Sequence, residues 1–273
     1  MKQGTRTLKS MGLIAGGGEL PALFVERARR SGYRLVIAAL RGEADPRLAS
    51  EGDSLQWISI GQLGKLISFF RREKITRALM LGRVRHAKIF SNIRFDFKAL
   101  ALLARAKDRS GETLLKEVAA ELGRGCIRLL DARFLMDESL AERGTLTRRG
   151  PSREQEATIR YGLKTARALA RMGVGQSLLL KKSAVAAVEA LEGTNEAIRR
   201  AGFLAGKGVI LVKTANPRQD WRFDVPTVGL KTIECLREIG AAGLVLEAGK
   251  SFLLEKEKTL AFADRNGLFL RVV

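Results

Sequence analysis

The residues best suited to chemistry in this chain lie within residues 213–229, between an apolar stretch and a predicted helix. Asp220 and Asp224 are carboxylates four positions apart. The cations of the segment are Lys213, Arg218 and Arg222. Carboxylates, substrate phosphates and waters are the usual ligands of Mg²⁺, which neutralises charge in phosphoryl transfer. The spacing therefore predicts a metal site with Asp220 and Asp224 as ligands; the alternative is a surface turn with Asp–Arg pairs.

A second candidate is the glycine turn, Gly16–Gly18, between a predicted strand and a predicted helix. Glycines allow backbone N–H groups to approach phosphate oxygens, and the N-terminus of the following helix favours negative charge. A dinucleotide-binding fingerprint would have a third glycine where Pro21 stands, and the Lys-Ser/Thr pair of a P-loop is missing. The turn thus predicts either a phosphate site or only a tight connection.

A third candidate begins at Gly82, Arg83 and Val84, after another predicted strand, and continues to Lys98. Its other cations and its aromatic residues are Arg85, Lys88, Arg94, Phe90, Phe95 and Phe97, and His86 lies among them. Ligands of open α/β sheets bind at the carboxyl ends of strands, so cations here suit a diphosphate. The aromatic residues suit an acyl chain or single-stranded nucleic acid. A solvated basic loop is the alternative.

Composition limits the remaining chemistry. The chain has 273 residues, 49 Lys and Arg against 29 Asp and Glu, a net charge of +20, one histidine and two cysteines. The charge favours anionic partners, and one histidine with two cysteines is too few for a histidine-rich or all-cysteine zinc site. Without a disulfide framework or a long apolar run, we expect a cytoplasmic protein that does not span a membrane.

Apolar runs alternate with amphipathic patterns, which predicts parallel sheets with helical crossovers. Strands are predicted over 11–15, 35–40, 78–81, 127–130, 177–181, 209–213, 243–246 and 268–272. Helices are predicted over 21–31, 61–73, 98–107, 113–122, 154–172 and 227–239. Gly193 is interpreted as the C-cap of a helix that ends there.

The predicted fold class is α/β with two domains. Residues 10–140 form a Rossmann-like domain with a parallel sheet, and residues 141–153, polar and basic around Gly150 and Pro151, form a linker. Residues 154–273 form a C-terminal α/β domain that carries Asp224, with a smaller mixed or parallel sheet.

Several of these motifs occur together in one known family. They are Ala-Gly-Gly-Gly-x-Leu-Pro near the start, Gly-x-Val at Gly82, Gly-Gln at Gln176, Val-Glu-Ala-x-Glu-Gly-Thr ending at Thr194, Arg-x-Asp-x-Pro-Thr-x-Gly from Arg222, and a late Glu247-Ala248-Gly249. In this order, from about residue 12 onward, the chain resembles the two-domain UDP-2,3-diacylglucosamine pyrophosphatases of lipid A biosynthesis, which are unrelated to the calcineurin-like type.

The resemblance implies Mg²⁺-dependent hydrolysis, with Mn²⁺ as the alternative metal, to UMP and 2,3-diacylglucosamine 1-phosphate (lipid X). It also implies attack by water on the β-phosphorus. Asp224 matches the family's essential aspartate within Arg-x-Asp-x-Pro. The chain departs from the family at Asn195, at Gly111-Glu112 and at Arg83. A lipid-linked substrate and the basic surface predict a cytoplasmic enzyme peripheral to the anionic inner membrane, with oligomeric state left open.

The candidate site residues combine these motifs with the basic segments. Those assigned to substrate are Gly17, Gly18, Gly82, Arg83, Val84, Gln176, Thr194, Lys213, Gln219, Arg222 and Thr227, and Asp224 is assigned to catalysis. Two other functions stay open. The charge alone would suit a nucleic-acid-binding protein, although no recognised motif is present. The glycine turn alone would suit a dinucleotide-dependent oxidoreductase, against which Pro21 argues.

Overall fold

The computed structural model describes residues 9–84, 95–108, 111–217, 219–223 and 225–273. The chain divides into two compact units, each of which is described by itself. The first unit is Met1–Met136 together with Trp221–Asp224, and the second is Asp137–Asp220 together with Val225–Val273. The first unit thus includes a short segment that belongs, by sequence, to the C-terminal half.

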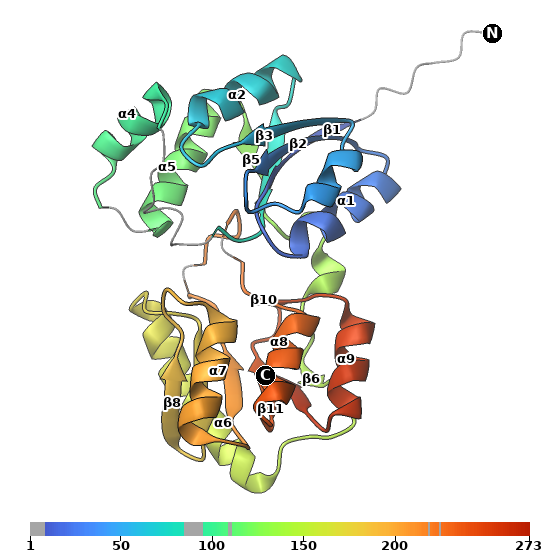
Figure 1. The fold of residues 1–273 in the computed structure, drawn as a ribbon, viewed down its shortest axis with the longest axis vertical. Helices are drawn as coiled ribbons and strands as arrows, with labels where there is room; N and C mark the ends of the chain where they lie inside the picture. The colour runs from blue at the N-terminus through green and yellow to red at the C-terminus, as the bar shows by residue number, and fades with distance from the viewer. Residues whose placement is uncertain (1–8, 85–94, 109–110, 218, 224) are drawn as a thin grey trace, which may run out of the picture. The chain divides into compact units, whose positions relative to one another are not determined.

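The first unit contains a five-stranded sheet in which every pairing is parallel (Figure 1). Its strands are β1 (Ser10–Ala15), β2 (Arg34–Leu40), β3 (Ser54–Ile58), β4 (Arg77–Leu81) and β5 (Arg128–Leu129), in the order β3-β2-β1-β4-β5. This order matches five of the six strands of the doubly wound nucleotide-binding sheet, 3-2-1-4-5-6. The prediction of a Rossmann-like parallel sheet is confirmed.

The helices α1 (Leu20–Arg30), α2 (Leu63–Arg72) and α5 (Gly111–Arg124) pack on this sheet, and α4 (Phe97–Arg105) packs against α2 and α5. A short 3-10 helix, Pro46–Ser50, follows β2. The helices form because their apolar residues recur at helical spacing; α2, for example, buries Leu66, Phe69 and Phe70. The resulting core lies against Ile14 and Val36 of the sheet.

The second unit contains a six-stranded mixed sheet. Its strands are β6 (Gly144–Thr145), β7 (Ser177–Lys181), β8 (Ala184–Val188), β9 (Ile210–Lys213), β11 (Gly243–Leu246) and β13 (Phe269–Val272), in the order β6-β13-β11-β9-β7-β8. The three central strands β13, β11 and β9 are parallel, and the outer pairings are antiparallel. The mixed α/β class is confirmed, but this sheet is larger than the first, not smaller.

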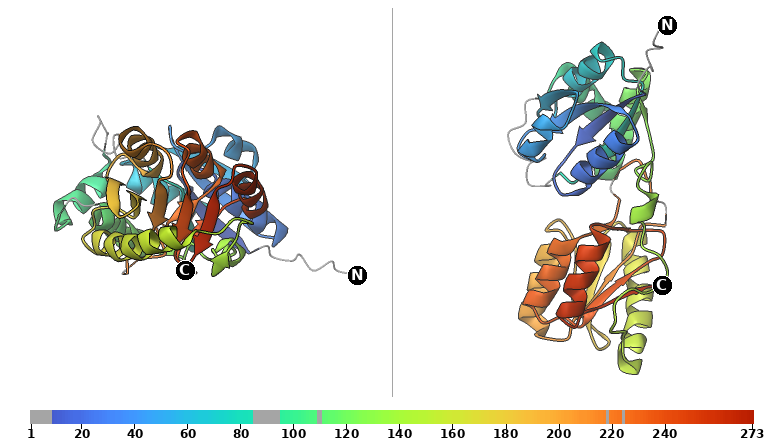
Figure 2. Two further views of the ribbon diagram at one scale, coloured as in Figure 1. Left: turned by 90° about the horizontal axis from the view of Figure 1, so that it is seen from below. Right: turned by 90° about the vertical axis from the view of Figure 1, so that its right-hand side faces the viewer.

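Helices cover both faces of the second sheet (Figure 2). The helix α6 (Arg153–Arg171) lies on one face, and α7 (Thr194–Ala205), α8 (Leu230–Glu238) and α9 (Lys256–Arg265) lie on the other. Two short strands, β10 (Thr227–Val228) and β12 (Phe252–Leu253), pair outside the main sheet, and a 3-10 helix spans Asp137–Ser139. No helix among the described residues is long and apolar enough to span a membrane.

Several elements differ from those predicted. Residues 141–153 contribute β6, which pairs with β13, so this stretch is part of the second unit. Gly193 does not end a helix; at φ +84° it is the N-cap of α7, and glycine suits a positive φ at either end of a helix. Thr227 starts a strand, and α8 begins only at Leu230. Elements that were not predicted are the helices α7 and α9 and the strands β3, β6, β8, β10 and β12.

Candidate functional site

The first candidate region lies where β1 and β4 end. The strand order reverses between these two neighbouring strands. On one side of β1 lie β2 and β3, and on its other side lie β4 and β5. In open α/β sheets a crevice outside the carboxyl ends of the strands at this point binds ligands. The glycine turn follows β1, and Gly82, Arg83 and Val84 follow β4.

The two loops are joined by backbone hydrogen bonds. Gly17 N–H donates to Arg83 O at 2.8 Å, and Arg83 N–H donates to Gly17 O at 2.9 Å. A Cβ on Gly16 would lie 2.7 Å from Arg83 O, and one on Gly82, at φ +90°, would lie 2.7 Å from Gly17 O. Only glycine permits this approach, so the sequence Gly-Gly-Gly and the later Gly82 fold as one feature.

Because of this backbone pairing, the candidate residues of the first unit have different roles. The N–H of Gly17 is used to brace the Gly82 loop, so its contribution is structural. Gly18, at φ +97° with open space where a Cβ would be, is exposed and leads into α1. Arg83 is also exposed, and Val84 is half-buried. The exposed backbone, the helix N-terminus and one cation suit a phosphate group.

The segment Trp221–Phe223 is built into the first unit. Ala132 N–H donates to Trp221 O at 2.7 Å, and the Arg133 guanidinium lies 4.5 Å from the centroid of the Trp221 ring. Phe223 is 3% exposed and belongs to the same core as α2 and β1. These contacts fix the backbone directly before Asp224, which itself lies outside the described residues.

Arg222 occupies a different part of the first unit. It lines a cavity of about 500 Å³ together with residues of α5, of β5 and of the turn between them, among them Ala119, Arg128 and Cys126. Its guanidinium also lies 5.6 Å from the centroid of the Phe223 ring. Arg218, like Asp224 and His86, lies outside the described residues.

The second candidate region lies in the second unit, at the end of β9. Lys213 is 6% exposed, and its Nζ donates to Ser177 Oγ at 3.1 Å and to Thr194 Oγ1 at 2.9 Å. Glu189 Oε2 lies 3.8 Å from the same nitrogen, and Thr194 Oγ1 donates to Glu189 Oε1 at 2.8 Å. We refer to Lys213, Ser177, Glu189 and Thr194 as the Lys213 cluster. Burial of the ammonium is tolerated because a carboxylate and two hydroxyls surround it.

Local structure explains how the Lys213 cluster assembles. Ser177 begins β7 directly opposite Lys213 in the β7–β9 register. Thr194 is the first residue of α7, held by the positive φ of Gly193. Next to Lys213, Thr214 is fully buried and its Oγ1 has no hydrogen-bond partner within the described ranges. The cluster therefore positions Thr194 and the first turn of α7, whose N–H groups are available to an anion.

A buried carboxylate holds the start of the loop that carries Asp220. Glu247, 3% exposed, accepts a hydrogen bond from Ala215 N–H at 3.1 Å and one from Arg167 Nε at 2.8 Å. Lys250 Nζ lies 3.5 Å from the same carboxylate. Glu247 thus connects α6, the end of β11 and the loop after β9.

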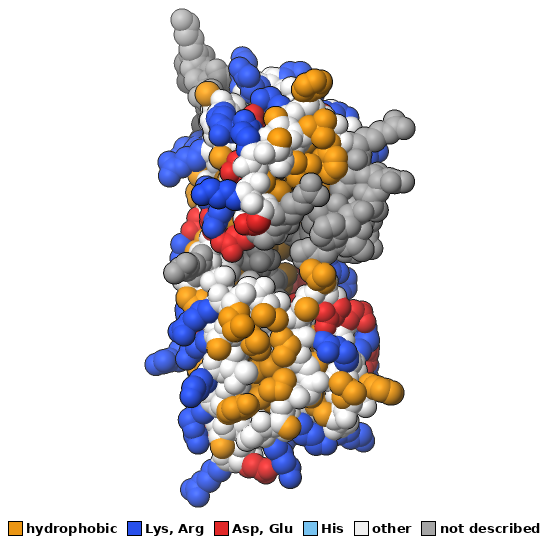
Figure 3. Space-filling view, turned by 90° about the vertical axis from the view of Figure 1, so that its left-hand side faces the viewer, with side chains coloured by type: hydrophobic (Ala, Val, Ile, Leu, Met, Phe, Trp, Pro, Cys, Tyr) orange, Lys and Arg blue, Asp and Glu red, His pale blue; other side chains and the backbone are white. Residues whose placement is uncertain are grey.

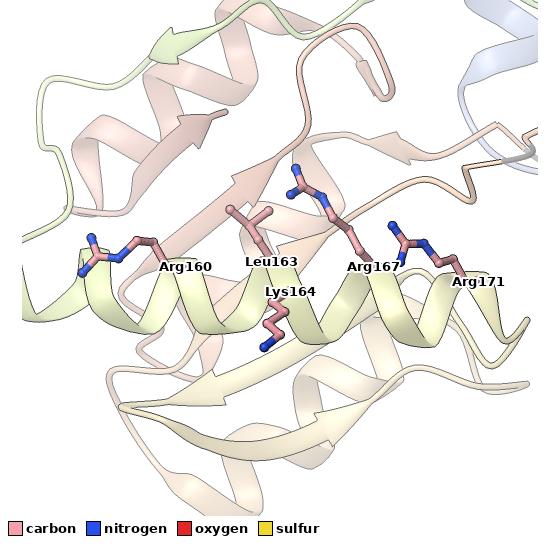
Figure 4. Close-up of a pocket in the computed structure, with 5 residues that line it drawn as sticks. All are labelled: Arg160, Leu163, Lys164, Arg167 and Arg171. Carbon is pink, nitrogen blue, oxygen red and sulfur yellow. The ribbon is translucent and has the colours of Figure 1, made fainter.

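The face of α6 that carries Arg167 is strongly basic. A shallow cavity of about 370 Å³ is lined by Arg160, Leu163, Lys164, Arg167 and Arg171. Figure 4 shows three of these arginines rising from the same side of the helix, and Lys164 pointing away from them. Arg167 forms an ion pair with the buried carboxylate of Glu247.

The remaining candidates are more dispersed. Gln176 O accepts a hydrogen bond from Thr214 N–H at 2.9 Å, beside the Lys213 cluster. Gln219 and Asp220 are half-buried in the loop, and Thr227 Oγ1 donates to Val225 O at 3.0 Å. In the part of the chain that the structure describes, no group of three or more Asp, Glu, His or Cys side chains could hold a metal.

Three residues of these regions were not predicted as site residues: Ser177, Glu189 and Glu247. Glu189 and Glu247 both belong to the family motifs, and each is a carboxylate that follows an apolar strand. That position could have marked them as buried ion-pair partners, because an isolated charge is not tolerated there.

Together, the fold and these regions define a two-unit α/β protein whose first unit has the strand order and glycine turn of nucleotide-binding sheets. Residues 10–139 match the model of the LpxI N-terminal domain, and residues 142–271 match that of the LpxI C-terminal domain. The chain belongs to the LpxI family. It is 32% identical to the UDP-2,3-diacylglucosamine pyrophosphatase LpxI of Caulobacter vibrioides, over 96% of this chain and 97% of that protein.

Two solved structures align with this chain at low similarity. Glycinamide-RNase-transformylase T from Mycobacterium tuberculosis aligns with a TM-score of 0.25 and 12% identity, over 66% of this chain and 44% of that one. The biotin carboxylase subunit of pyruvate carboxylase aligns with a TM-score of 0.26 and 15% identity, over 72% of this chain and 42% of that one.

Proposed function

We propose that this protein hydrolyses the pyrophosphate bond of UDP-2,3-diacylglucosamine in lipid A biosynthesis, giving UMP and 2,3-diacylglucosamine 1-phosphate. One observation carries the proposal: the chain is similar to the C. vibrioides pyrophosphatase along nearly the whole length of both proteins. Both domain models of the family also match, in the same order.

In the first unit, we assign the loops after β1 and β4 to the diphosphate of the substrate. The exposed turn at Gly18 and the N-terminus of α1 present backbone N–H groups, which favour phosphate oxygens. Arg83 adds an exposed positive charge beside them. Gly17 and Gly82 keep the two loops together through their backbone contacts.

In the second unit, we assign a positioning role to Lys213. Its ammonium is enclosed by Ser177, Thr194 and Glu189, so it acts on substrate through the residues that it holds. Thr194 and the first turn of α7 are the groups that we propose contact an anionic part of the substrate. Glu247 has the parallel role of holding the backbone of Ala215 at the start of the loop.

Asp224 and Asp220 are the residues that we propose to hold Mg²⁺, with Mn²⁺ as the alternative. Mg²⁺ is usually held by one or two carboxylates, substrate phosphates and waters, so two aspartates supply enough protein ligands for it. When bound, the ion would neutralise the charge that develops on the phosphates. Asp224 would also position the attacking water.

The proposed step is attack of water oxygen on the β-phosphorus, next to the sugar. A bond forms between that oxygen and the phosphorus, and the bond from the phosphorus to the bridging oxygen breaks. UMP leaves with the bridging oxygen, and the water's protons are released to solvent as both monophosphates form. Trp221 and Phe223 fix the chain before Asp224, which supports a role in orientation.

Incubation of the purified protein with detergent-solubilised UDP-2,3-diacylglucosamine and Mg²⁺, followed by mass spectrometry, tests the proposal. Wild type should form both products, EDTA should abolish them, and added Mg²⁺ should restore them. Asp224→Asn should lose activity while its melting temperature is unchanged, with Glu257→Gln on exposed α9 as the matched control. In ¹⁸O water the label should enter the lipid monophosphate. No turnover by folded wild type would contradict the proposed function; label in UMP would contradict only β-attack.

We further propose that the protein works at the cytoplasmic surface of the inner membrane, as a peripheral protein. The lipid-linked substrate of the related pyrophosphatase and the net charge of +20 support this location. Membrane-fraction and salt-wash experiments on cells that produce the protein test it. The proposal expects the protein to sediment with membranes at low salt and to be released by a high-salt wash. Protein that stays in the supernatant at low salt would contradict the proposal.

A further inference from the structure

Helix α4 (Phe97–Arg105) exposes an apolar stripe on its outer side. Phe97 is 92% exposed and Leu100 is 51% exposed, and Ala101 and Ala104 are exposed on the same side. These positions follow i, i+3, i+4 and i+7, so they form one continuous row along the helix. Phe95, just before the helix, is 38% exposed. The inward side buries only Ala99 and Leu102.

The neighbouring helix α2 shows how unusual this is. It is of similar length, yet it buries Leu63, Leu66, Ile67, Phe69 and Phe70 against the sheet and exposes mainly polar residues. A helix of a globular protein normally turns its apolar stripe inward in this way. Figure 3 views the side where α4 lies outermost, and hydrophobic side chains gather there on the unit that carries α4 as well as on the second unit.

Polar contacts prevent α4 from rolling to bury the row. Lys98 Nζ lies 2.8 Å from Glu121 Oε1, and Arg105 lies 3.1 Å from Glu121 Oε2. At the start of α4, Asp96 accepts hydrogen bonds from Ala99 N–H at 3.0 Å and from Gly64 N–H at 2.7 Å. Both ends of the helix are therefore attached to α5 and α2, and the outward direction of Phe97 is fixed.

Cations border the apolar row. Lys98, Arg105 and Arg124 all pair with Glu121, which gives three positive charges for one carboxylate. Their side chains remain 49%, 48% and 54% exposed, so they reach solvent beside the row. An apolar face flanked by basic residues is the pattern of helices that lie in the headgroup region of anionic membranes.

We propose that α4 docks this unit onto an anionic lipid bilayer, with Phe97 and Leu100 entering the boundary between headgroups and acyl chains. Lys98, Arg105 and Arg124 would contact the lipid phosphates. The inference deepens the proposed function, on which it rests for its lipid-linked substrate. A second copy of the chain fits less well, because each copy has a net charge of +20 and would present the same basic border.

Flotation with vesicles tests the surface without substrate. Wild type should float with phosphatidylglycerol-containing vesicles at low salt, and much less with phosphatidylcholine alone. The double variant F97S/L100S should bind the anionic vesicles at least about 10-fold more weakly, since it removes two apolar anchors. The matched control is F203S/L204S on α7, whose side chains are 90% and 62% exposed. It should bind within about 2-fold of wild type. F97W should retain binding.

Each other outcome of the flotation overturns the proposal. Wild type that fails to float would exclude a membrane surface. F97S/L100S that floats like wild type would exclude α4, and equal loss in both double variants would indicate non-specific adhesion. Binding that occurs only with a protein partner would assign the row to a protein interface.

Hydrolysis assays separate this inference from the proposed function. In detergent micelles F97S/L100S should keep wild-type turnover, whereas on anionic vesicles its rate should fall with its binding. Loss of turnover in micelles as well, with the fold intact, would show that α4 contacts the substrate, and would overturn the docking role. Wild type that binds vesicles through Phe97 but hydrolyses nothing would contradict the proposed function and leave the docking surface supported.

Discussion

The candidate region at the ends of β1 and β4 in the first unit and the one at the end of β9 in the second each contain a cation, but they are built from different parts of the chain. Both lie where parallel strands end, the usual place for ligands. The first is built from backbone: Gly16, Gly17 and Gly82 approach one another closely, and its cation Arg83 is exposed. The second is built from side chains, and its cation Lys213 is enclosed by protein groups.

The comparison shows that a lysine and an arginine selected for the same reason have different roles. An exposed guanidinium remains available to substrate, whereas an ammonium that is already surrounded stabilises the site's structure. Mutation should therefore separate the two regions: changes at the Lys213 cluster should affect folding first, and changes at Arg83 should affect activity first. The predictions below test this difference in order of expected effect.

The largest effect is expected from Lys213→Met. Removing the ammonium leaves Glu189 without its cation in a mostly buried position, which should cost about 3–5 kcal/mol. Chemical denaturation monitored by circular dichroism measures it. Adding Glu189→Gln should recover part of the loss, and Lys164→Met, at an exposed position of α6, should be nearly neutral. A Lys213→Met protein as stable as wild type would show that the cluster does not need its charge pair.

The next effect is expected from Gly82→Ala. The new Cβ would lie 2.7 Å from Gly17 O at a residue with φ +90°, which should destabilise the protein by about 2–4 kcal/mol. Gly18→Ala is the control, because its φ is also positive but its Cβ would meet nothing within 4 Å. It should cost only about 1 kcal/mol. Equal losses would mean that backbone conformation, and not the close approach, determines the cost.

Arg83→Ala should lower kcat/KM by about 10- to 100-fold, because one charge-assisted contact to phosphate is lost. Its melting temperature should stay that of wild type, since the side chain is exposed. Arg83→Lys should recover part of the activity. Steady-state kinetics on the micellar substrate provide the measurement. A wild-type kcat/KM for Arg83→Ala would remove Arg83 from the substrate site.

The smallest effect concerns Glu121, whose pKa falls to about 2 because Lys98 and Arg124 donate hydrogen bonds to it. A lowered pKa stabilises the folded protein above the usual pKa of 4.5, and that stabilisation is lost as pH falls toward 2. Glu121→Gln should therefore cost about 1–2 kcal/mol at pH 7, with its half-exposed partners taken into account. The difference from wild type should shrink between pH 4.5 and 2; a constant difference would indicate that charge is not its cause.

Periodicity and turn residues predicted much of both sheets. The ranges 177–181 and 243–246 match β7 and β11, because short apolar runs between helical patterns have few other interpretations. Among the missed strands, β3 is half-buried and partly polar, and β8 is a partly exposed strand at the edge of the sheet. The others, β6, β10 and β12, have only two residues each, too few for a periodic pattern. The helices α7 and α9 were missed for a similar reason, since few of their residues are buried.

In the candidate site, too, some residues could be predicted from the sequence and some contacts could not. Motifs identified Gly17, Gly82, Thr194 and Lys213, and the structure brings the first two together in one unit and the last two in the other. The association of Trp221 with Ala132 could not be predicted, because it depends on the path of the loop through space. Whether Asp220 and Asp224 bind metal stays a prediction.

By itself, the sequence determined the α/β class, the glycine turn after the first strand, and the family resemblance, because these depend on residue types at short spacing. The tertiary structure decided which charges are exposed and which are enclosed. It turned Lys213 inward, directed the apolar row of α4 outward, and included Trp221–Asp224 in the first unit. Such outcomes depend on contacts between residues far apart in the chain, and those contacts leave no periodic trace in the sequence.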